Sequence, residues 1–343
     1  MDLLATDVLG KPLWLWLAFL AIVGALLAFD LGVLHRTDKE IGIAESLKLS
    51  AFYIAVALAF GGLVWAYMGP LQGMNYLTGY VIEKALSIDN VFVISLIFGY
   101  FAIPRKYQYR ALLWGILAVL VLRGIMIVVG AALVQQYAWV LYIFGAFLIF
   151  TGVKMFVAGE IEMDPSKNAI MRFLTKRMRV TAELHGQHFV VLKPDPRTGK
   201  LVRYTTPLFL ALVMINIADL VFAVDSVPAI FAITTDTYIV FTANIMAILG
   251  LRALYFAIAA MVHRFEYLKY ALAIVLVFIG AKIFWNDLVG KVQPAVSLGV
   301  TLALIAAGVL YSLWRTRDEA PEPVPVVEVA STAALVDRTK RPE

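Results

Sequence analysis

The sequence predicts an all-α fold: a polytopic membrane helical bundle of about nine transmembrane helices with two inverted three-helix repeats. The prediction rests on the composition, a series of long apolar stretches, and a pattern that recurs in the two halves. Of the 343 residues, 62% are hydrophobic and 15% are charged, whereas a soluble domain is about half apolar and about a quarter charged. This composition argues against a soluble enzyme. The chain has no cysteine, which excludes disulfides and thiolate metal sites.

Nine stretches are long and apolar enough to cross a membrane. A helix needs about 20 mostly apolar residues to cross a hydrocarbon layer of roughly 30 Å. The first stretch is read as a retained span and not as a signal peptide, because it is long and follows Asp2 and Asp7 instead of basic residues. The predicted spans are 12–34, 47–68, 76–102, 111–133, 137–158, 207–233, 238–261, 267–286 and 295–314.

The distribution of Lys and Arg predicts the orientation. With the N-terminus outside, the segments that face the cytoplasm hold 22 basic residues, and the outer segments hold only Lys11 and Lys291. Basic residues are enriched in cytoplasmic loops. We therefore expect a multi-pass protein of the cell (inner) membrane with an outer N-terminus and a cytoplasmic C-terminus. The net charge of +5 follows from this topology and does not indicate a nucleic-acid partner.

The spans divide the chain into four parts. The segments HFVVLK and KLVRYT flank a Pro/Asp/Gly turn and predict a β-hairpin in the long cytoplasmic loop. The Pro-rich end of the chain is typical of a disordered tail. The predicted parts are spans one to five (1–158, first repeat at about 76–158), the loop (159–205), spans six to nine (206–317, second repeat at about 206–286) and the tail (318–343).

Three segments of the first half align with three of the second. SIDNVFVISLIF (87–98) aligns with AVDSVPAIFAIT (223–234), VLRGIM (121–126) with GLRALY (250–255), and FTGVKMF (150–156) with FIGAKIF (278–284). Each repeat has three spans, so the second enters the membrane from the opposite side, as in many secondary transporters. The alignment pairs Glu83 with Asp219, Asp89 with Asp225, Arg123 with Arg252, and Lys154 with Lys282.

Acidic residues lie within or near these apolar stretches. A charged side chain at the bilayer centre costs about 2.5–3.5 kcal/mol on insertion scales, and such residues usually face the bundle interior. Amide and hydroxyl oxygens lie beside them, and carboxylates with such oxygens suit Mg²⁺, Ca²⁺ or Mn²⁺. The sequence thus predicts a divalent-cation site. The acids are Asp30, Glu83, Asp89, Asp219 and Asp225, with Asn90 and Ser226 among the neighbouring oxygen donors.

Helical periodicity sorts these residues into faces. Glu83, Ser87 and Asn90 share one face, and Asp219 and Ser226 share the corresponding face of the second repeat. Asp89 and Asp225 point roughly 120° away on an ideal helix. Convergence of all four acids therefore requires interrupted helices. Pro228 predicts such a break in the second repeat, and the long apolar run around Asp89 suits one in the first.

Four basic residues of the repeats have two readings. They either form static ion pairs with the acids, or they act as charge-balancing or gating groups that neutralise the acids when an ion leaves. These residues are Arg123, Arg252, Lys154 and Lys282.

The motifs EKALSIDNVFV, DLVFAVDSVPA, FDLGVLHR and the pair GVKMF/GAKIF resemble the TerC family of integral membrane proteins, most closely its Alx branch, over roughly residues 12–315. The resemblance implies a member of the LysE-like transporter superfamily, associated with manganese export, tellurium resistance and the response to alkaline pH. By similarity, Asp89, Asn90, Asp225 and Ser226 would form the ion-binding core. Glu83 and Asp219 would flank it, and Asp30 would be a gate or an additional ligand.

The leading hypothesis is a secondary transporter that exports Mn²⁺ by alternating access. Its partners would be the lipid bilayer and the metal substrate, with no organic cofactor; proton coupling and homo-oligomerisation are left open. The alternative is a membrane scaffold or redox and metal-stress protein whose acids are locked in ion pairs. A metalloenzyme that binds zinc through His185 and His188 is a weaker third reading, so the chain is not expected to be an enzyme.

Overall fold

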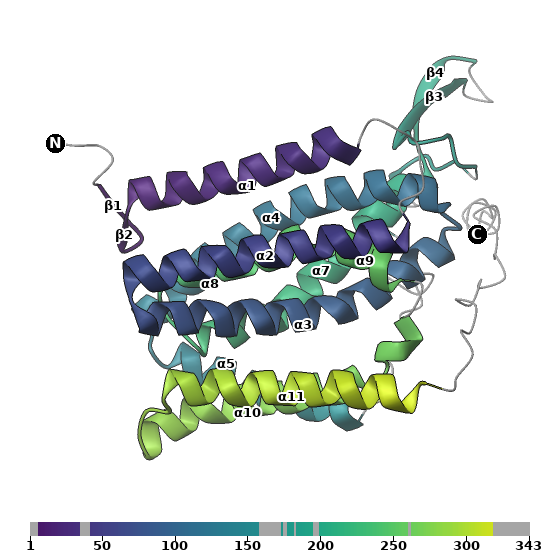
Figure 1. The fold of residues 1–343 in the computed structure, drawn as a ribbon. Coiled ribbons are helices and arrows are strands. Elements are labelled where there is room, and N and C mark those ends of the chain that lie inside the picture. Colours follow the sequence, from purple (N-terminus) through teal and green to yellow (C-terminus); the bar gives the residue numbers. More distant parts are fainter. Residues whose placement is uncertain are drawn as a thin grey trace.

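Long helices that run side by side form almost the whole described chain in the computed structural model (Figure 1). The structure describes residues 6–34, 42–157, 173, 177–181, 183–194, 199–259 and 262–317. Two short strands, Asp7–Val8 (β1) and Lys11–Pro12 (β2), precede the first helix. The predicted disordered tail from 318 lies outside the described residues.

The helices begin and end within a few residues of the predicted spans. In the first half they are α1 (Leu13–Leu34), α2 (Ile43–Met68), α3 (Pro70–Tyr100), α4 (Arg105–Gln136) and α5 (Val140–Val157). In the second half they are α7 (Pro207–Phe231), α8 (Thr237–Leu249), α9 (Leu251–Ile258), α10 (Leu268–Leu288) and α11 (Pro294–Arg315), with a 3₁₀ turn at Val262–Phe265 (η3). The all-α membrane bundle is thereby confirmed.

In the part of the chain that the structure describes, eight helical stretches are long and apolar enough to cross a membrane, with α8 and α9 counted as one stretch. The predicted third span, α3, is not among them. It has 31 residues and carries Glu83, Lys84 and Asp89 in its middle. It is also the most enclosed helix of the first half, because it packs against α2, α7, α8 and α11.

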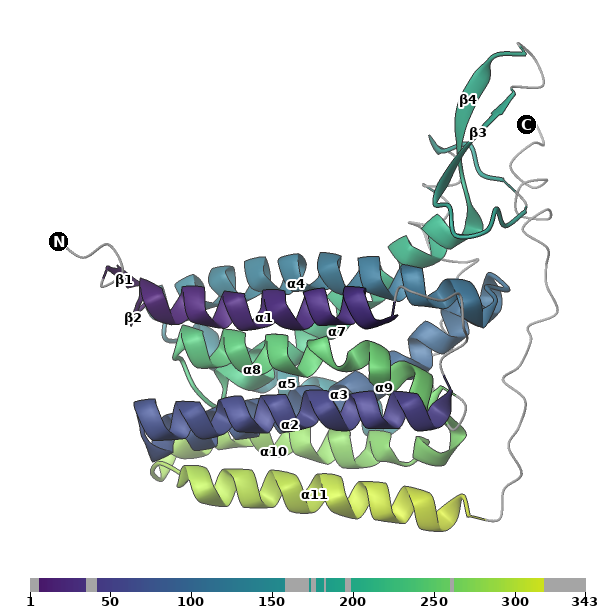
Figure 2. The ribbon, with the colours of Figure 1, turned by 45° about the horizontal axis from the view of Figure 1, so that its top comes forward.

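The two ends of the bundle differ. The helix α1 begins at one end, and α11 finishes at the other (Figures 1 and 2). Strands β3 (Val190–Pro194) and β4 (Leu201–Thr205) form an antiparallel hairpin beside the end where α11 finishes. Arg105, Lys269 and Arg315 stand at helix ends on this hairpin side, while Lys11 and Lys291 stand on the other.

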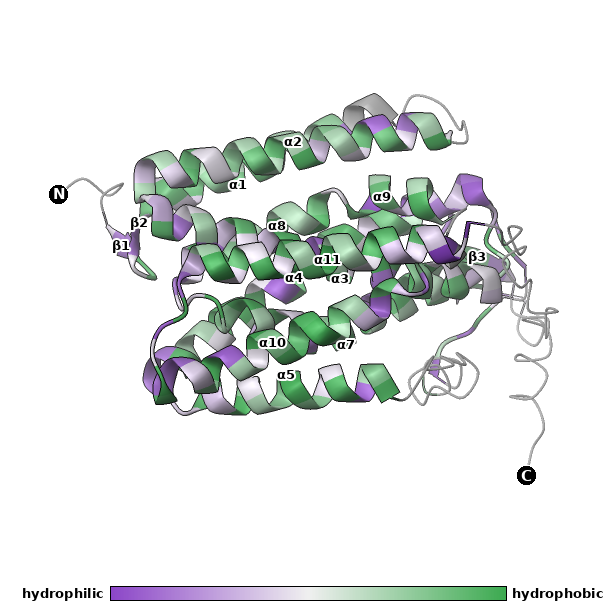
Figure 3. Ribbon diagram, turned by 60° about the horizontal axis from the view of Figure 1, so that its bottom comes forward, coloured by the Kyte–Doolittle hydropathy of each residue, from purple (hydrophilic) through white to green (hydrophobic). Residues whose placement is uncertain are grey.

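Apolar side chains fill the bundle and also cover its outside. One buried cluster joins α3, α4, α7 and α9, and another joins α1, α2, α3 and α8. Large apolar residues such as Val121, Phe150 and Leu310 are more than half exposed, as expected for a surface in contact with lipid. Polar residues concentrate at the two ends, with a few in the middle (Figure 3).

The helix breaks are not where the sequence placed them. The helix α7 continues through Pro228 to Phe231, and α3 is helical throughout. The predictions of an interruption beside Asp89 and of one at Pro228 are therefore wrong. Proline removes one hydrogen-bond donor and clashes with the preceding turn, but Pro228 lies within one turn of the end of α7. The break in the second half falls instead at Gly250, between α8 and α9.

Candidate functional site

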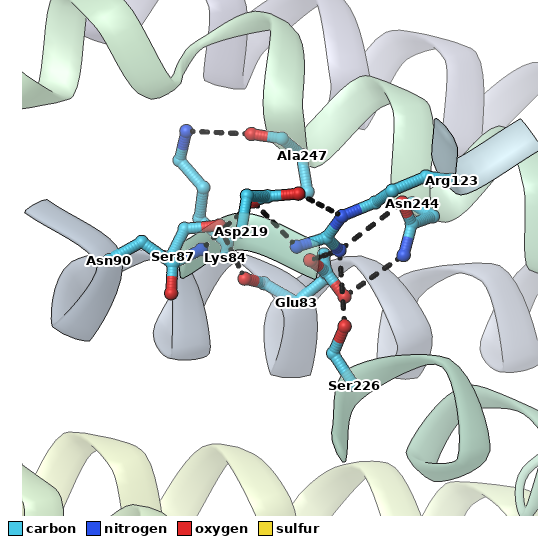
Figure 4. A network of polar contacts seen from close by, with 9 residues as sticks. All are labelled: Glu83, Lys84, Ser87, Asn90, Arg123, Asp219, Ser226, Asn244 and Ala247. Atoms are coloured by element: carbon cyan, nitrogen blue, oxygen red, sulfur yellow. Dashed lines mark hydrogen bonds and ion pairs between the residues drawn. The ribbon is translucent and has the colours of Figure 1, made fainter. Parts of the chain in front are cut away.

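The guanidinium of Arg123 lies between two carboxylates in the middle of the bundle (Figure 4). Arg123 is on α4, Glu83 on α3 and Asp219 on α7. Arg123 is paired with Glu83 through Nη1 and binds Asp219 with two bonds, Nε to Oδ2 at 3.1 Å and Nη2 to Oδ1 at 3.0 Å. The exposed fractions of Arg123 and Glu83 are 1%, and that of Asp219 is 7%. The cluster is thus a buried, bidentate ion-pair triad.

Neutral polar groups complete this triad. Asn244 of α8 donates to Glu83 Oε2 at 3.0 Å and accepts from Arg123 at 3.4 Å. Ser226 Oγ accepts from Arg123 Nη1 at 3.1 Å. Asn90 donates to Asp219 Oδ1 at 3.4 Å. We name these six residues (Glu83, Asn90, Arg123, Asp219, Ser226 and Asn244) the central cluster.

Helical spacing explains why these side chains meet. Glu83 and Asn90 are seven residues apart on α3, and Asp219 and Ser226 are seven apart on α7, so each pair lies on one helix face. Helices α3 and α7 pack against each other, which brings the two faces together around Arg123. Ser87, on the same face of α3, donates to the backbone oxygen of Glu83 at 2.7 Å and thereby stays out of the cluster.

The structure does not bring Asp89 and Asp225 into this cluster. Each lies six residues beyond the central acid of its helix, which is about 9 Å along the axis. Because α3 and α7 run in opposite directions (Figure 1), the two displacements lead towards opposite ends of the bundle. Asp225 Oδ1 accepts from Thr151 of α5 at 3.2 Å and has Lys154 as an electrostatic neighbour. Lys269 is the corresponding neighbour of Asp89.

Asp30 belongs to a second buried ion pair. It is paired with Arg252 of α9, whose guanidinium lies over the ring of Tyr109 at 4.2 Å from the ring centroid. The Tyr109 hydroxyl donates to the backbone oxygen of Asp30 at 3.2 Å. The two arginines that the repeat alignment pairs, Arg123 and Arg252, therefore stand in different environments.

Two lysines, the part-buried Lys84 and the buried Lys282, bind neutral oxygens. Lys84 donates to the backbone oxygen of Ala247 at 3.3 Å, and Lys282 donates to Ser297 Oγ at 3.2 Å. Ala247 is in α8 and Ser297 in α11, so each lysine joins two helices. Arg123 and Arg252 are thus in ion pairs, Lys282 is bound to a neutral group, and Lys154 is an electrostatic neighbour of Asp225.

A cavity adjoins the central cluster on the side of the hairpin. It lies between α3, α4, α7 and α9. Its polar lining consists of Asn90 and Asp219 from the central cluster and Arg252 from the second ion pair, and the remainder is mostly apolar. The cavity therefore connects the surroundings of the two arginines.

The oxygen atoms of the central cluster could hold a hard cation, although Arg123 occupies the position between the acids in this conformation. Among the described residues, no group of three or more His, Asp or Glu side chains is arranged to hold a metal. In the loop, His185 Nδ1 lies 2.9 Å from the backbone oxygen of Glu183. The hypothesis of a zinc site at His185 and His188 therefore gains no support.

The sequence predictions overlooked several members of these networks. Asn244 is an oxygen donor on the span that follows Asp225, but it was not among the predicted metal ligands. Tyr109 and Thr151 gave no signal either, since both are common types in spans. The periodic faces of α3 and α7 were the usable signal, and they point to Glu83 and Asp219 instead of Asp89 and Asp225.

Comparison with known proteins finds one membrane-protein family and similar membrane proteins from several bacteria. The model of the integral membrane protein TerC family matches residues 68–320. An uncharacterized membrane protein of Myxococcus xanthus is 46% identical over 308 residues, which cover 90% of this chain and 94% of the relative. A membrane protein of Rickettsia felis, also uncharacterized, is 45% identical over 300 residues, or 88% of this chain and 97% of the relative.

Relatives named Alx have a name that refers to an activity. Alx of Escherichia coli, which is named as a candidate membrane-bound redox modulator, is 42% identical over 317 residues, covering 90% of this chain and 96% of the relative. No solved structure matches the chain.

Proposed function

Because this chain belongs to the TerC family of integral membrane proteins, we propose that it is a secondary transporter that exports divalent metal ions, with Mn²⁺ as the substrate. The observation that carries the proposal is the central cluster: two buried carboxylates from different helices share one guanidinium in the middle of a membrane bundle. Charged groups at this depth are costly and are usually functional.

The chemistry of the cluster suits a hard divalent cation. Carboxylate, amide and hydroxyl oxygens are ligands that Mn²⁺ accepts, and Glu83, Asp219, Asn244 and Ser226 supply them around one point. With all three charged groups ionised, the triad carries one net negative charge. An entering ion would therefore replace Arg123 between the acids, and Arg123 would return when the ion leaves. In this cycle Arg123 is the charge-balancing group.

The cluster lies between the two predicted repeats. Glu83, Asn90 and Arg123 belong to the first repeat, and Asp219, Ser226 and Asn244 belong to the second. We propose that these halves are inverted repeats that rock against each other and expose the cluster to one side at a time. The N-terminus is proposed to lie outside and the hairpin inside.

In this proposal Asp89 and Asp225 do not form a shared ion-binding core. They flank the cluster along the bundle axis, Asp89 towards the hairpin end and Asp225 towards the other end. We assign them to the two approach routes of the ion, where each would bind it in turn. Proton exchange for the ion at these carboxylates is part of the proposal.

The second candidate function is a redox or metal-stress role without transport. The buried ion pairs support this function, because both acids are already paired with Arg123 and do not require another cation. The name of the Escherichia coli relative points the same way. Under this reading the central cluster only fixes the packing of α3, α4 and α7.

Reconstitution in liposomes that contain a Mn²⁺-sensitive dye tests the proposal. The parent protein is expected to mediate Mn²⁺ flux, and Glu83→Gln and Asp219→Asn are expected to lower it by at least about tenfold, equivalent to roughly 1.4 kcal/mol. Glu45→Gln, at an exposed position in the first turn of α2, is the matched control and should transport like the parent. Absence of Mn²⁺ flux from the parent under every pH gradient would reject transport and favour the redox role.

A further inference from the structure

Arg252 faces the same cavity as two members of the central cluster. Asn90 and Asp219 line this cavity from α3 and α7, and Arg252 lines it from α9. Between them the wall is formed largely by apolar side chains and by Gly115 of α4. Arg252 thus shares a cavity with Asp219, one acid of the central cluster, and its ion pair is with Asp30 instead.

Unpartnered polar atoms occur on both sides of this cavity. Arg252 is 2% exposed, and its Nη1 has no hydrogen-bond partner. Asn90 is 5% exposed, and its Oδ1 has no partner either. Buried polar groups are paired in the great majority of cases, and each exception requires an explanation. Here a donor and an acceptor of complementary type line the same space.

Arg252 lies directly beside a break in the helical stretch. The helical stretch breaks at Gly250, where α8 ends and α9 begins, and Arg252 is the second residue of α9. Its carboxylate partner, Asp30, comes from α1, which belongs to neither repeat. Arg252 is therefore paired with a carboxylate that lies outside both predicted repeats.

Movement of Arg252 towards the acids would restore the charge balance of the central cluster. When Arg123 withdraws, Glu83 and Asp219 become two buried carboxylates without a counter-ion, and an unpaired buried charge is strongly destabilising. A second arginine that enters from the cavity would remove this cost without a metal ion. Arg252 is the residue that the repeat alignment pairs with Arg123.

We propose that Arg252 is a second, exchangeable counter-ion of the Glu83–Asp219 pair. It stays with Asp30 while Arg123 binds the acids, and it crosses the cavity to Asp219 and Asn90 when Arg123 withdraws. The inference rests on the proposed transport function, because only a cycle in which Arg123 leaves the acids requires a replacement. The exchange would let the empty transporter change sides without carrying an ion.

Labelling of one cysteine in the cavity tests the exchange. The chain has no native cysteine, and a Cβ at Gly115 would meet its nearest neighbours at 3.7 Å, an ordinary contact distance. Gly115→Cys therefore provides a probe for methyl methanethiosulfonate in the purified full-length protein. Added to it, Asp30→Asn should release Arg252 into the cavity and slow labelling by about threefold or more.

The control is the same protein with Arg252→Gln added, in which labelling should recover at least to the rate of the Gly115→Cys parent. A purely structural ion pair predicts the opposite, since loss of Asp30 would loosen the packing and speed labelling. Unchanged or faster labelling in the Asp30→Asn variant would overturn the proposal. If that variant does not fold, Tyr109→Leu weakens the hold on Arg252 by removing the ring beneath it, and the same expectations apply.

A transport measurement separates failure of this proposal from failure of the proposed function. Asp30→Asn should raise the Mn²⁺ concentration for half-maximal flux by about threefold or more, because the freed Arg252 competes for the acids, and Arg252→Gln should reverse the increase. Labelling requires no metal, so a parent without Mn²⁺ flux leaves the labelling result valid. Flux in the parent combined with unslowed labelling would reject the exchange alone.

Discussion

Arg123 is the residue on which the central cluster depends. Its two hydrogen bonds to Asp219 and its pairing with Glu83 place one positive charge between two acids that have almost no exposure to solvent. Removing one partner of such a buried pair costs far more than the pair itself contributes, because the remaining charges stay buried and uncompensated. The same reasoning makes Arg123 the group that a metal ion must replace.

We expect Arg123→Leu to lower the free energy of unfolding by about 3–5 kcal/mol, because it leaves two unpaired carboxylates. Millimolar Mn²⁺ should restore part of that loss in the variant, since the ion takes the place of the guanidinium. Thermal unfolding in detergent with and without Mn²⁺ measures both effects. The control is Lys11→Gln, which breaks the part-exposed Lys11–Asp236 pair and should cost only about 0–1 kcal/mol. Equal losses in the two variants would contradict a special role for Arg123.

The four acids of α3 and α7 should separate into two classes. Glu83 and Asp219 share Arg123, so the effects of Glu83→Gln and Asp219→Asn on stability should be non-additive by roughly 0.5–3 kcal/mol. Asp89 and Asp225 are about 18 Å apart along the axis, which follows from the helical rise, and Asp89→Asn and Asp225→Asn should add within about 0.5 kcal/mol. Double-mutant cycles measure both couplings. A strong coupling between Asp89 and Asp225 would instead favour the shared ion-binding core that the family resemblance implies.

At the scale of elements, close packing of glycines joins α5 to α10. A Cβ at Gly280 would lie 2.6 Å from the backbone oxygen of Gly145, and one at Gly152 would lie 2.7 Å from the backbone oxygen of Ala273. Small residues allow helix backbones to approach closely within a membrane, where no hydrophobic effect drives helices together. This contact fixes α10 beside α5, which carries Thr151, the partner of Asp225.

Gly280→Leu should therefore destabilise the protein, because the new side chain has no space without separation of α5 and α10. We expect a loss of at least about 1–3 kcal/mol, the usual range for overpacking. Gly299→Ala, in α11 with no heavy atom within 4 Å of the added Cβ, should have little effect. Thermal unfolding of the two variants provides the measurement, and an unaffected Gly280→Leu variant would show that the two helices are not held by this contact.

The orientation of the whole molecule in the membrane can be tested with single introduced cysteines, because the chain has none of its own. The hairpin lies at one end of the bundle (Figure 2), and most of the described basic residues belong to the hairpin or to helix ends on that side. Cytoplasmic segments are enriched in Lys and Arg. Leu192→Cys, at an exposed position in β3, should react with a membrane-impermeant maleimide only after cells are opened. Val289→Cys, exposed between α10 and α11, should react in intact cells. The reverse pattern would invert the orientation and, with it, the proposed direction of export.

The sequence alone determined the long helices, because a helix that crosses a membrane needs a fixed length of apolar residues. The nine predicted stretches correspond to described helices within a few residues, although α3 is not among the eight described stretches that are apolar enough to cross a membrane. The sequence also determined that Glu83 and Asn90 share a face, as do Asp219 and Ser226, because helical periodicity is a local property. Which faces meet was decided by tertiary packing. The opposite directions of α3 and α7 bring Glu83 to Asp219 and carry Asp89 away from Asp225. Contacts between residues more than a hundred positions apart, such as Arg123 with Asn244 and Glu83 with Asn244, depend on how whole helices pack, and no local pattern encodes them.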